Sequence, residues 1–250
     1  MKLIDWLKQE EFSLTLSSGF FGFFAHTGVL TVLEEEGLKP RRIMGASSGA
    51  LAGSCWAAGI DSIDLRKILF DLKRQDFWDP GFGLGLLKGQ KFRDKLAEIL
   101  PVETFEECPI PLALSAYDMR SKKVIALDSG ELVPAIYASC AIPFMFQPIE
   151  HQGYKFLDGG IKDRPALVPA EKDERIFFHH IASKSSWRKK EDPSIQIPQR
   201  NNLASLAIYD LPRSGPTKLA VGQEAYQRAY FATRRALNME LIDGNVSVAG

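Results

Sequence analysis

Residues 41–59 read "RRIMGASSGALAGSCWAAG" and place Ser47 in a tight turn between an apolar run and an alanine-rich stretch. The run before Gly45 predicts a β-strand, and the small residues after the turn favour a helix. Gly45 and Gly49 lie two positions on either side of Ser47, where a side chain would collide if the backbone folded sharply. The stretch therefore predicts a strand-turn-helix unit with Ser47 at the amino end of its helix.

A second unit of the same kind precedes this one. Residues 12–17 alternate as a strand does, and residues 23–37 carry apolar side chains at helical spacing, with Gly37 as the helix stop. Two such units in succession indicate an α/β fold. The remaining pattern predicts strands over 110–119, 122–129, 154–160 and 175–183, and helices over 131–140, after residue 90, and around Tyr226, Tyr230, Leu237 and Leu241.

Composition limits the classes of protein that fit. A chain of 250 residues that is 45% apolar and 25% charged can bury a sizeable core, and we expect one domain over residues 1–250. The 31 basic residues balance the 31 acidic ones, so the net charge gives no reason to expect nucleic acid as a partner.

The cysteines and the amino terminus bear on the cellular compartment. Cys55, Cys108 and Cys140 are widely spaced, which is typical of buried, reduced thiols in a cytosolic protein. Charges interrupt the first fourteen residues too often for a signal peptide, and no apolar stretch is long enough to span a membrane. We therefore expect a cytoplasmic protein. The spacing of its carboxylates and histidines matches neither zinc nor EF-hand sites, so we expect no metal and no cofactor.

Ser47 has two interpretations. At a helix amino terminus, unpaired N–H groups and the helix dipole favour developing negative charge, which suits a nucleophile in acyl transfer. The alternative is a serine that only caps a helix in a glycine turn. Ser48 is the rival nucleophile, but it lies one step off the centre of the glycine frame and is expected to begin the helix.

A nucleophilic serine also needs a base and an oxyanion site. Asp158 ends a strand-like run and is followed by Gly159 and Gly160. An aspartate before two glycines is often a turn former, and it becomes a candidate base through its pairing with Ser47.

Two segments look irregular. Residues 77–90, "FWDPGFGLGLLKGQ", are expected to pack against the core, with a lid or a lipid-contacting loop as the alternative. Residues 183–202 are polar, basic and proline-bearing, and we expect a solvated surface loop, with an arm that contacts lipid headgroups as the alternative.

Four motifs occur in one order across most of residues 12–170: a G-V-L-x-x-L-E-E-E-G-L helix, the G-x-S-x-G turn, an A-S-x-A-I-P-x-x-F-x-P stretch and the D-G-G turn. Together they resemble the patatin-like phospholipase family. The resemblance implies a three-layer α/β fold with a central, mostly parallel sheet flanked by helices. It further implies a Ser-Asp dyad without a catalytic histidine, with Ser47 as nucleophile and Asp158 as base.

The resemblance also places the oxyanion loop, and here the sequence departs from the family pattern. The family's glycine-rich G-G-G-x-R/K-G loop falls on residues 18–23, where Gly19 alone matches and no basic residue is present. A shift of one residue would use Gly22 as the closing glycine. Gly19 and Gly22 are therefore the candidate oxyanion residues, while simple core packing of the phenylalanines around them is the alternative.

Three functions remain open at this stage. The leading one is a serine hydrolase that acts on phospholipid or lysophospholipid through an acyl-enzyme and makes transient contact with a membrane surface. The second is a Ser-His-Asp esterase that uses His179 or His180, although both lie in an apolar run where a structural histidine is expected. The third is a catalytically weak lipid-binding or regulatory protein of the same fold, which the altered oxyanion loop keeps open.

Overall fold

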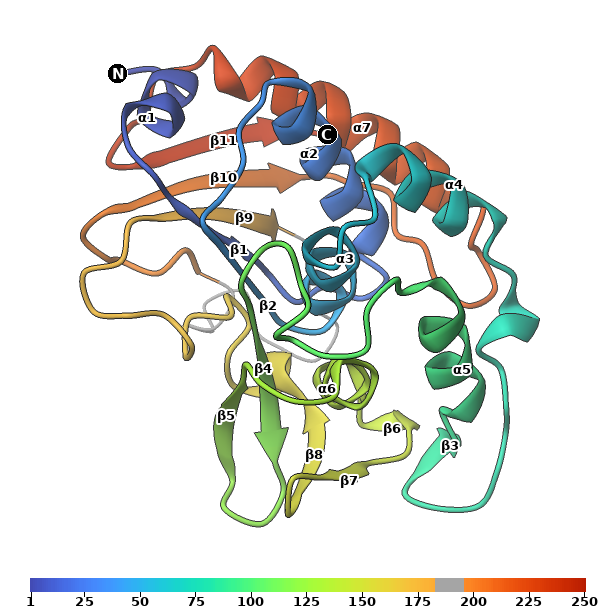
Figure 1. The fold of residues 1–250 in the computed structure, drawn as a ribbon. Coiled ribbons are helices and arrows are strands. Elements are labelled where there is room, and N and C mark those ends of the chain that lie inside the picture. Colours follow the sequence, from blue (N-terminus) through green and yellow to red (C-terminus); the bar gives the residue numbers. More distant parts are fainter. Residues whose placement is uncertain (183–195) are drawn as a thin grey trace.

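The structure is a computed structural model, and it describes residues 1–182 and 196–250. Within these residues, nine strands form one sheet in the order β11-β10-β9-β1-β2-β4-β8-β7, with β5 paired to β4 (Figure 1). The strands are β1 (Ser13–Leu16), β2 (Arg42–Gly45), β4 (Leu112–Asp118), β5 (Lys123–Leu127), β7 (Ile149–His151), β8 (Tyr154–Asp158), β9 (Ile176–Ala182), β10 (Leu203–Tyr209) and β11 (Asn245–Ala249). A second, two-stranded sheet pairs β3 (Gly85–Leu87) with β6 (Phe144–Phe146).

The sheet is parallel from β11 to β4 and antiparallel beyond it. The helices are α1 (Leu3–Gln9), α2 (Phe23–Glu35), α3 (Ser48–Ala57), α4 (Ser62–Asp71), α5 (Gln90–Ile99), α6 (Leu132–Cys140) and α7 (Val221–Leu237), with short 3-10 turns η1 (Arg74–Asp76) and η2 (Gly159–Ile161). The predicted α/β fold with a mostly parallel sheet flanked by helices is thus confirmed.

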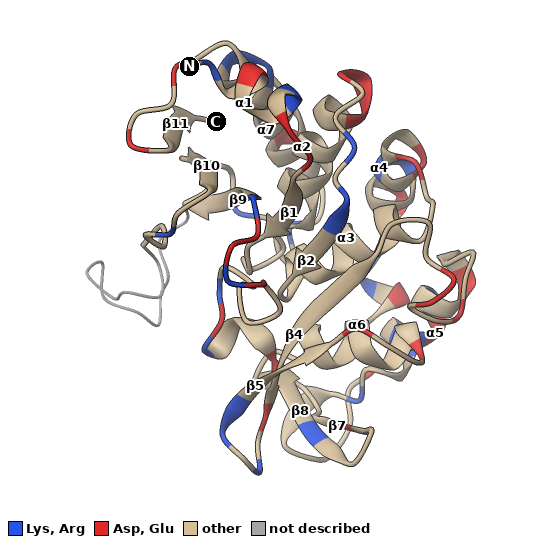
Figure 2. Ribbon diagram, turned by 60° about the vertical axis from the view of Figure 1, so that its left-hand side comes forward, with Lys and Arg blue, Asp and Glu red and all other residues tan. Residues whose placement is uncertain are grey.

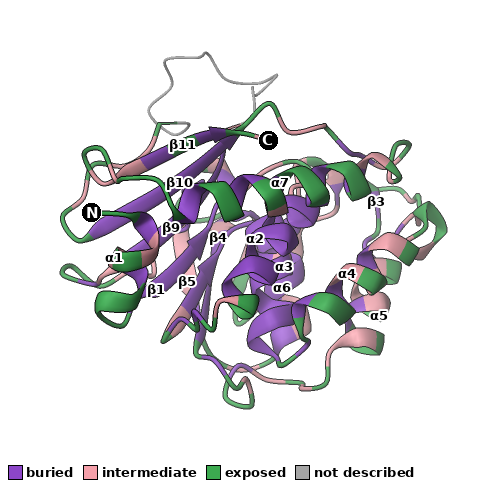
Figure 3. Cartoon of the chain, turned by 90° about the horizontal axis from the view of Figure 1, so that it is seen from above, coloured by how far each residue is buried: buried purple, intermediate pink, exposed green. Residues whose placement is uncertain are grey.

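The core lies between the sheet and its helices. Helices α2 and α3 are almost entirely buried, whereas α7 packs along α2 and keeps an exposed outer face (Figure 3). A smaller apolar cluster on the opposite face of the sheet includes Met44, Ala113 and Phe178. Charged residues gather mainly on helix surfaces and loops, and most of the sheet is uncharged (Figure 2). The helical face of the sheet therefore forms the main hydrophobic core.

The predicted elements are largely confirmed. Strands β1, β2, β4, β5, β8 and β9 and helices α2, α3, α5 and α6 lie where the sequence predicts them, and Gly37 adopts the left-handed conformation (φ 66°) that ends α2. The carboxyl-terminal helix ends at Leu237, so the prediction that it reaches Leu241 is wrong. Helices α1 and α4 and strands β3, β6, β7, β10 and β11 were not predicted from the sequence.

Candidate active site

The turn between β2 and α3 holds Ser47 in a strained conformation. Its backbone lies at φ 55° and ψ −120°, a region that residues other than glycine rarely adopt. A Cβ on Gly45 would come within 2.7 Å of the Ala50 nitrogen, and one on Gly49 would collide with the Leu16 carbonyl oxygen. Both glycines are therefore required by close backbone approach, and α3 begins at Ser48 as predicted.

Helix α6 supports this turn from one side. The Ser47 N–H donates to Ser139 Oγ at 3.0 Å, and that hydroxyl donates to the Ser115 carbonyl at 2.8 Å. The Cys140 thiol donates to the Ser47 carbonyl at 3.0 Å. Two hydrogen bonds from neighbouring residues of α6 thus hold the Ser47 peptide groups on both sides. The roles of Ser139 and Cys140 could not be predicted from the sequence, because nothing local marks a serine as a support for a distant turn.

Strand β4 brings the Ser47 and Asp158 turns together. Leu114 pairs with Gly45 at the end of β2, and Ala116 pairs with Asp158 at the end of β8. Because β5 occupies the other edge of β4 over residues 114–118, β2 and β8 must share one edge and point toward each other. Their end residues are two register positions apart, about 7 Å of strand. The two turns that the sequence singles out therefore meet over Ser115.

Asp158 is buried at this meeting point. It is 5% exposed, its N–H donates to the Ala141 carbonyl at 3.0 Å, and its Oδ1 accepts from the Gly160 N–H at 2.8 Å. A Cβ on Gly159 would overlap the Ser115 carbonyl oxygen, which explains the first glycine of the D-G-G turn. Asp158 thus has the turn-forming hydrogen bond expected of such a residue, in addition to its place opposite the Ser47 turn.

Electrostatics also link Asp158 to the serine turn through Cys140. Burial first, and then the negative charge of Asp158, raise the pKa of the Cys140 thiol well above its usual value. The thiol therefore stays protonated and can donate its hydrogen bond to Ser47 at any ordinary pH. Cys140 is a structural donor here. All three cysteines are free, and Cys55 and Cys140 are buried as predicted, whereas Cys108 is only half-buried.

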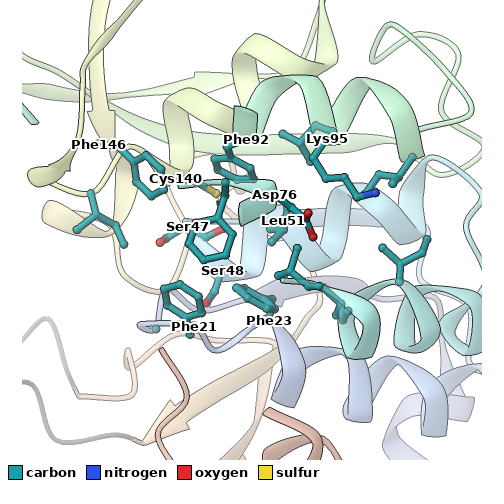
Figure 4. A pocket seen from close by; sticks show the side chains of 18 residues that line it. Phe21, Phe23, Ser47, Ser48, Leu51, Asp76, Phe92, Lys95, Cys140 and Phe146 are labelled. Carbon is teal, nitrogen blue, oxygen red and sulfur yellow. Dashed lines mark hydrogen bonds between the residues drawn. The ribbon is translucent and has the colours of Figure 1, made fainter. Parts of the chain in front are cut away.

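An apolar cavity of about 100 Å³ opens beside Ser47 (Figure 4). Ser47, Ser48, Gly19 and Cys140 line one end of it. The rest of its wall is mostly aromatic and aliphatic and comes from α3, α4, α5, β6 and the loops beside them; it includes Phe21, Phe77, Phe92, Leu96 and Phe146, with Asp76 and Lys95 as its charged members. The space next to the hydroxyl therefore suits a hydrocarbon chain better than a polar group.

The loop between β1 and α2 contains the predicted oxyanion residues. Gly19 lines the cavity together with Ser47. The N–H groups of Ser18 and Gly22 donate to the carbonyls of Arg164 and Gly19, at 2.8 and 2.9 Å. Within the described part of the chain, the N–H of Gly19 donates no backbone hydrogen bond. Gly22 instead allows close packing, since a Cβ there would overlap Ile181 Cδ1 and lie 3.0 Å from Ser48 Oγ.

Two histidines form a buried pair away from the cavity. His26 Nδ1 lies 2.8 Å from His179 Nδ1, and His26 Nε2 lies 2.8 Å from the Ser17 carbonyl. A carbonyl only accepts, so His26 carries its proton on Nε2 and His179 must donate from Nδ1. Burial lowers the pKa of His26 to about 4 and that of His179 well below its usual value, so both rings are neutral.

The other two histidines also lie elsewhere. His180 contacts the Phe178 ring, with centroids 5.5 Å apart, and by strand alternation it faces the side of the sheet opposite His179. His151 is in β7, near the end of the sheet. None of the four histidines is among the described residues that line the cavity at Ser47. Likewise, no group of three or more potential metal ligands occurs in the described residues.

The two segments that look irregular in the sequence are residues 77–90 and 183–202. The ends of residues 77–90 pack inward as expected, with Phe77 and Leu87 buried, but the expectation is wrong for the middle, where Phe82, Leu84 and Leu86 are exposed. Most of the polar segment at 183–202 lies outside the described residues, so its predicted character stays a prediction. A search of the described residues finds no helix long and apolar enough to cross a membrane.

Comparison with known proteins places this site in a family. A sequence model of the patatin-like phospholipase family matches residues 14–170, which include Gly19, Ser47 and Asp158. The chain therefore belongs to the patatin-like phospholipase family. An uncharacterized NTE family protein of Mycobacterium tuberculosis is 34% identical over 213 residues, covering 80% of this chain and 58% of that protein.

Two further likenesses are more distant. A lysophospholipase NTE1 of Scheffersomyces stipitis is 25% identical over 170 residues, covering 65% of this chain and 11% of that protein. The crystal structure of VipD from Legionella pneumophila superposes with a TM-score of 0.64 at 15% identity, over 91% of this chain and 67% of that one. The VipD likeness supports the patatin-like fold. The chain spans little more than half the length of the mycobacterial relative and a small part of the yeast one.

Proposed function

We propose that this chain is a lipid acyl-ester hydrolase that works through a Ser47-Asp158 dyad within one domain. The observation that carries the proposal is the strained Ser47 at the end of an apolar cavity, with the Asp158 turn meeting it along one edge of β4. Strain at a serine between a strand and a helix is typical of nucleophile turns. Membership of a phospholipase family supports the same conclusion.

The proposed reaction has two halves. Ser47 Oγ attacks the ester carbonyl carbon while its proton passes to the Asp158 carboxylate. The tetrahedral intermediate then collapses, and the proton moves from Asp158 to the leaving alcohol, which leaves an acyl group on Ser47. Water attacks this acyl-enzyme with Asp158 again taking a proton, which returns to Ser47 Oγ as the fatty acid departs.

The oxyanion of each tetrahedral intermediate needs hydrogen-bond donors. We assign the Gly19 N–H to this role, because Gly19 lines the cavity and its N–H is not used by another backbone carbonyl of the described chain. The amino end of α3 adds a favourable dipole at the same place. Gly22, whose N–H is already bonded, would act by keeping this loop close to Ser48.

The substrate class follows from the cavity. Its apolar wall would hold an acyl chain, and the name of the yeast relative suggests a lysophospholipid or phospholipid as donor. Such lipids reside in membranes, so we also propose transient contact with a membrane surface. Three free cysteines fit action in the reducing cytoplasm.

A lipid panel tests this function. Wild type and Ser47→Ala are incubated with phospholipids and lysophospholipids of several headgroups, and released fatty acids are measured by mass spectrometry. We expect Ser47-dependent release from at least one class. A serine-reactive phosphonate that labels wild type but not Ser47→Ala would separate an active enzyme from a lipid-binding protein. Release that is equal in both proteins would refute the assignment.

A further inference from the structure

The segment before β3 forms a hairpin with an apolar tip. The Lys88 N–H donates to the Asp79 carbonyl at 3.0 Å and the Gly81 N–H to the Leu86 carbonyl at 3.0 Å, which folds residues 79–88 back on themselves. At the far end, Phe82 is 104% exposed and Leu84 is 63% exposed. Large apolar side chains at such exposure contribute nothing to the core of this chain.

Leu86 is also exposed, and a further apolar side chain lies on the neighbouring strand. Phe144, 81% exposed, opposes Gly85 in the pairing of β3 with β6. We call Phe82, Leu84, Leu86 and Phe144 together the apolar tip. In Figure 1, β3 and β6 lie at the lower right of the molecule, on the side away from α7.

The apolar tip lies two residues along β6 from the wall of the cavity beside Ser47. The register that pairs Gly85 with Phe144 also pairs Leu87 with Phe146, and both of these are buried. Phe146 lines the cavity, where Figure 4 shows it close to Cys140 and Phe92. In β6, the exposed Phe144 belongs to the tip, and Phe146, two residues later, belongs to the cavity wall.

Cations outnumber carboxylates where the hairpin joins α5. Residues 88–94 carry Lys88, Lys91 and Arg93 against one carboxylate, Asp94, which accepts from the Gln90 side chain at 2.7 Å. The preceding acidic residue, Asp79, uses its carboxylate to accept the N–H groups of residues 89, 90 and 91 at the start of α5, at 2.7 to 3.1 Å. Its negative charge is therefore engaged within the protein.

We propose that the apolar tip inserts into the surface of a phospholipid bilayer and holds the cavity mouth against it. This inference rests on the proposed lipid hydrolase activity and names the surface that would serve it. Aromatic and aliphatic side chains with cations at their base match the boundary between headgroups and acyl chains. A large exposed apolar patch on a monomer also indicates an interaction site.

Vesicle binding in a catalytically silent background tests the proposal. Ser47→Ala protein is sedimented with phosphatidylcholine vesicles, with and without phosphatidylglycerol, and compared with the same protein carrying Phe82→Ser and Leu84→Ser. We expect the double variant to lose about a hundredfold in partitioning, since burial of each of the two side chains is worth about tenfold. Phe231→Ser is the matched control, because Phe231 is 59% exposed on α7.

The same substitutions are then made with Ser47 intact. We expect turnover of a soluble p-nitrophenyl ester to be unchanged and hydrolysis of vesicle lipid to fall. Tip variants that bind vesicles as well as their parent would overturn the inference, and so would a parent that does not bind. A tip variant that alters sedimentation velocity but not vesicle binding would assign the tip to self-association instead. Failure of the proposed function would show separately, as no Ser47-dependent hydrolysis of either substrate.

Discussion

The hydroxyl of Ser139 joins two parts of the site, accepting from the Ser47 N–H at 3.0 Å and donating to the Ser115 carbonyl at 2.8 Å. Ser139→Ala would leave a buried N–H without its acceptor, so we expect a loss of about 1–3 kcal/mol in unfolding free energy, together with lower kcat. Ser54→Ala is the matched control, because Ser54 Oγ is buried with no hydrogen-bond partner in the described structure. Urea unfolding of both variants should separate them; equal losses would contradict the bridging role.

Ser47→Ala should abolish ester turnover while leaving the thermal midpoint almost unchanged, because replacing this hydroxyl leaves the main-chain hydrogen bonds of Ser47 to Ser139, Cys140 and Leu51 in place. Ser48→Ala should keep most activity, since Ser48 Oγ has no partner in the described residues. Turnover of a p-nitrophenyl ester and differential scanning calorimetry provide the two readouts. Wild-type turnover in Ser47→Ala would refute Ser47 as the nucleophile. An inactive Ser48→Ala would assign that role to Ser48 instead.

Asp158→Asn separates a base from a turn former. Asparagine keeps the shape and can still accept from the Gly160 N–H, so the fold should persist. It cannot take the serine proton, and we expect kcat to fall by at least about a hundredfold. The measurement is kcat on a soluble ester across pH. If Asp158→Asn kept activity close to wild type and a substitution of His179 or His180 abolished it, a Ser-His-Asp triad would be favoured.

Gly49→Ala should damage the fold itself. Its Cβ would overlap the Leu16 carbonyl, a backbone group that cannot rotate away, so we expect a loss of about 3 kcal/mol or more. Gly53→Ala, in the same helix, would meet only the side chains of Ile43 and Leu16 and should cost much less. Thermal unfolding compares the two. A well-folded Gly49→Ala would show that the turn tolerates a side chain.

The buried histidine pair predicts a weakness toward acid. Burial lowers the pKa of His26 to about 4 in the folded chain, against about 6.5 when unfolded. The unfolded state therefore binds more protons below about pH 6.5, and stability should fall as pH drops from there toward 4, by about 3 kcal/mol from this residue. Urea unfolding at several pH values should show that the free energy of unfolding of His26→Gln depends less steeply on pH than that of wild type. Ring nitrogen shifts that report a charged His26 at pH 5.5 would contradict this.

Local features made much of this fold predictable. The Ser47 turn is predictable from the sequence because the close approach of its backbone requires Gly45 and Gly49, which lie within five residues. By contrast, β10 is held by pairing with β9 and β11, which a single sequence does not reveal, and the role of Ser139 depends on a contact 92 residues away. For residues 77–90 the sequence left both packing against the core and a lipid-contacting loop open, and packing was favoured because phenylalanine is most often buried.

Strand register sets the spacing in the proposed enzyme. Since β2 and β8 end against one edge of β4, Asp158 can shift relative to the Ser47 turn only in whole steps. A slip of one residue would move it by about 3.3 Å and turn its side chain to the opposite face of the sheet. The distance between Ser47 and Asp158 therefore cannot be adjusted in small steps by sliding β8 along β4. During divergence, this ladder and α6, which lies between β4 and β8 and supports the Ser47 turn, would be inherited intact, or the chemistry would be lost in a single event.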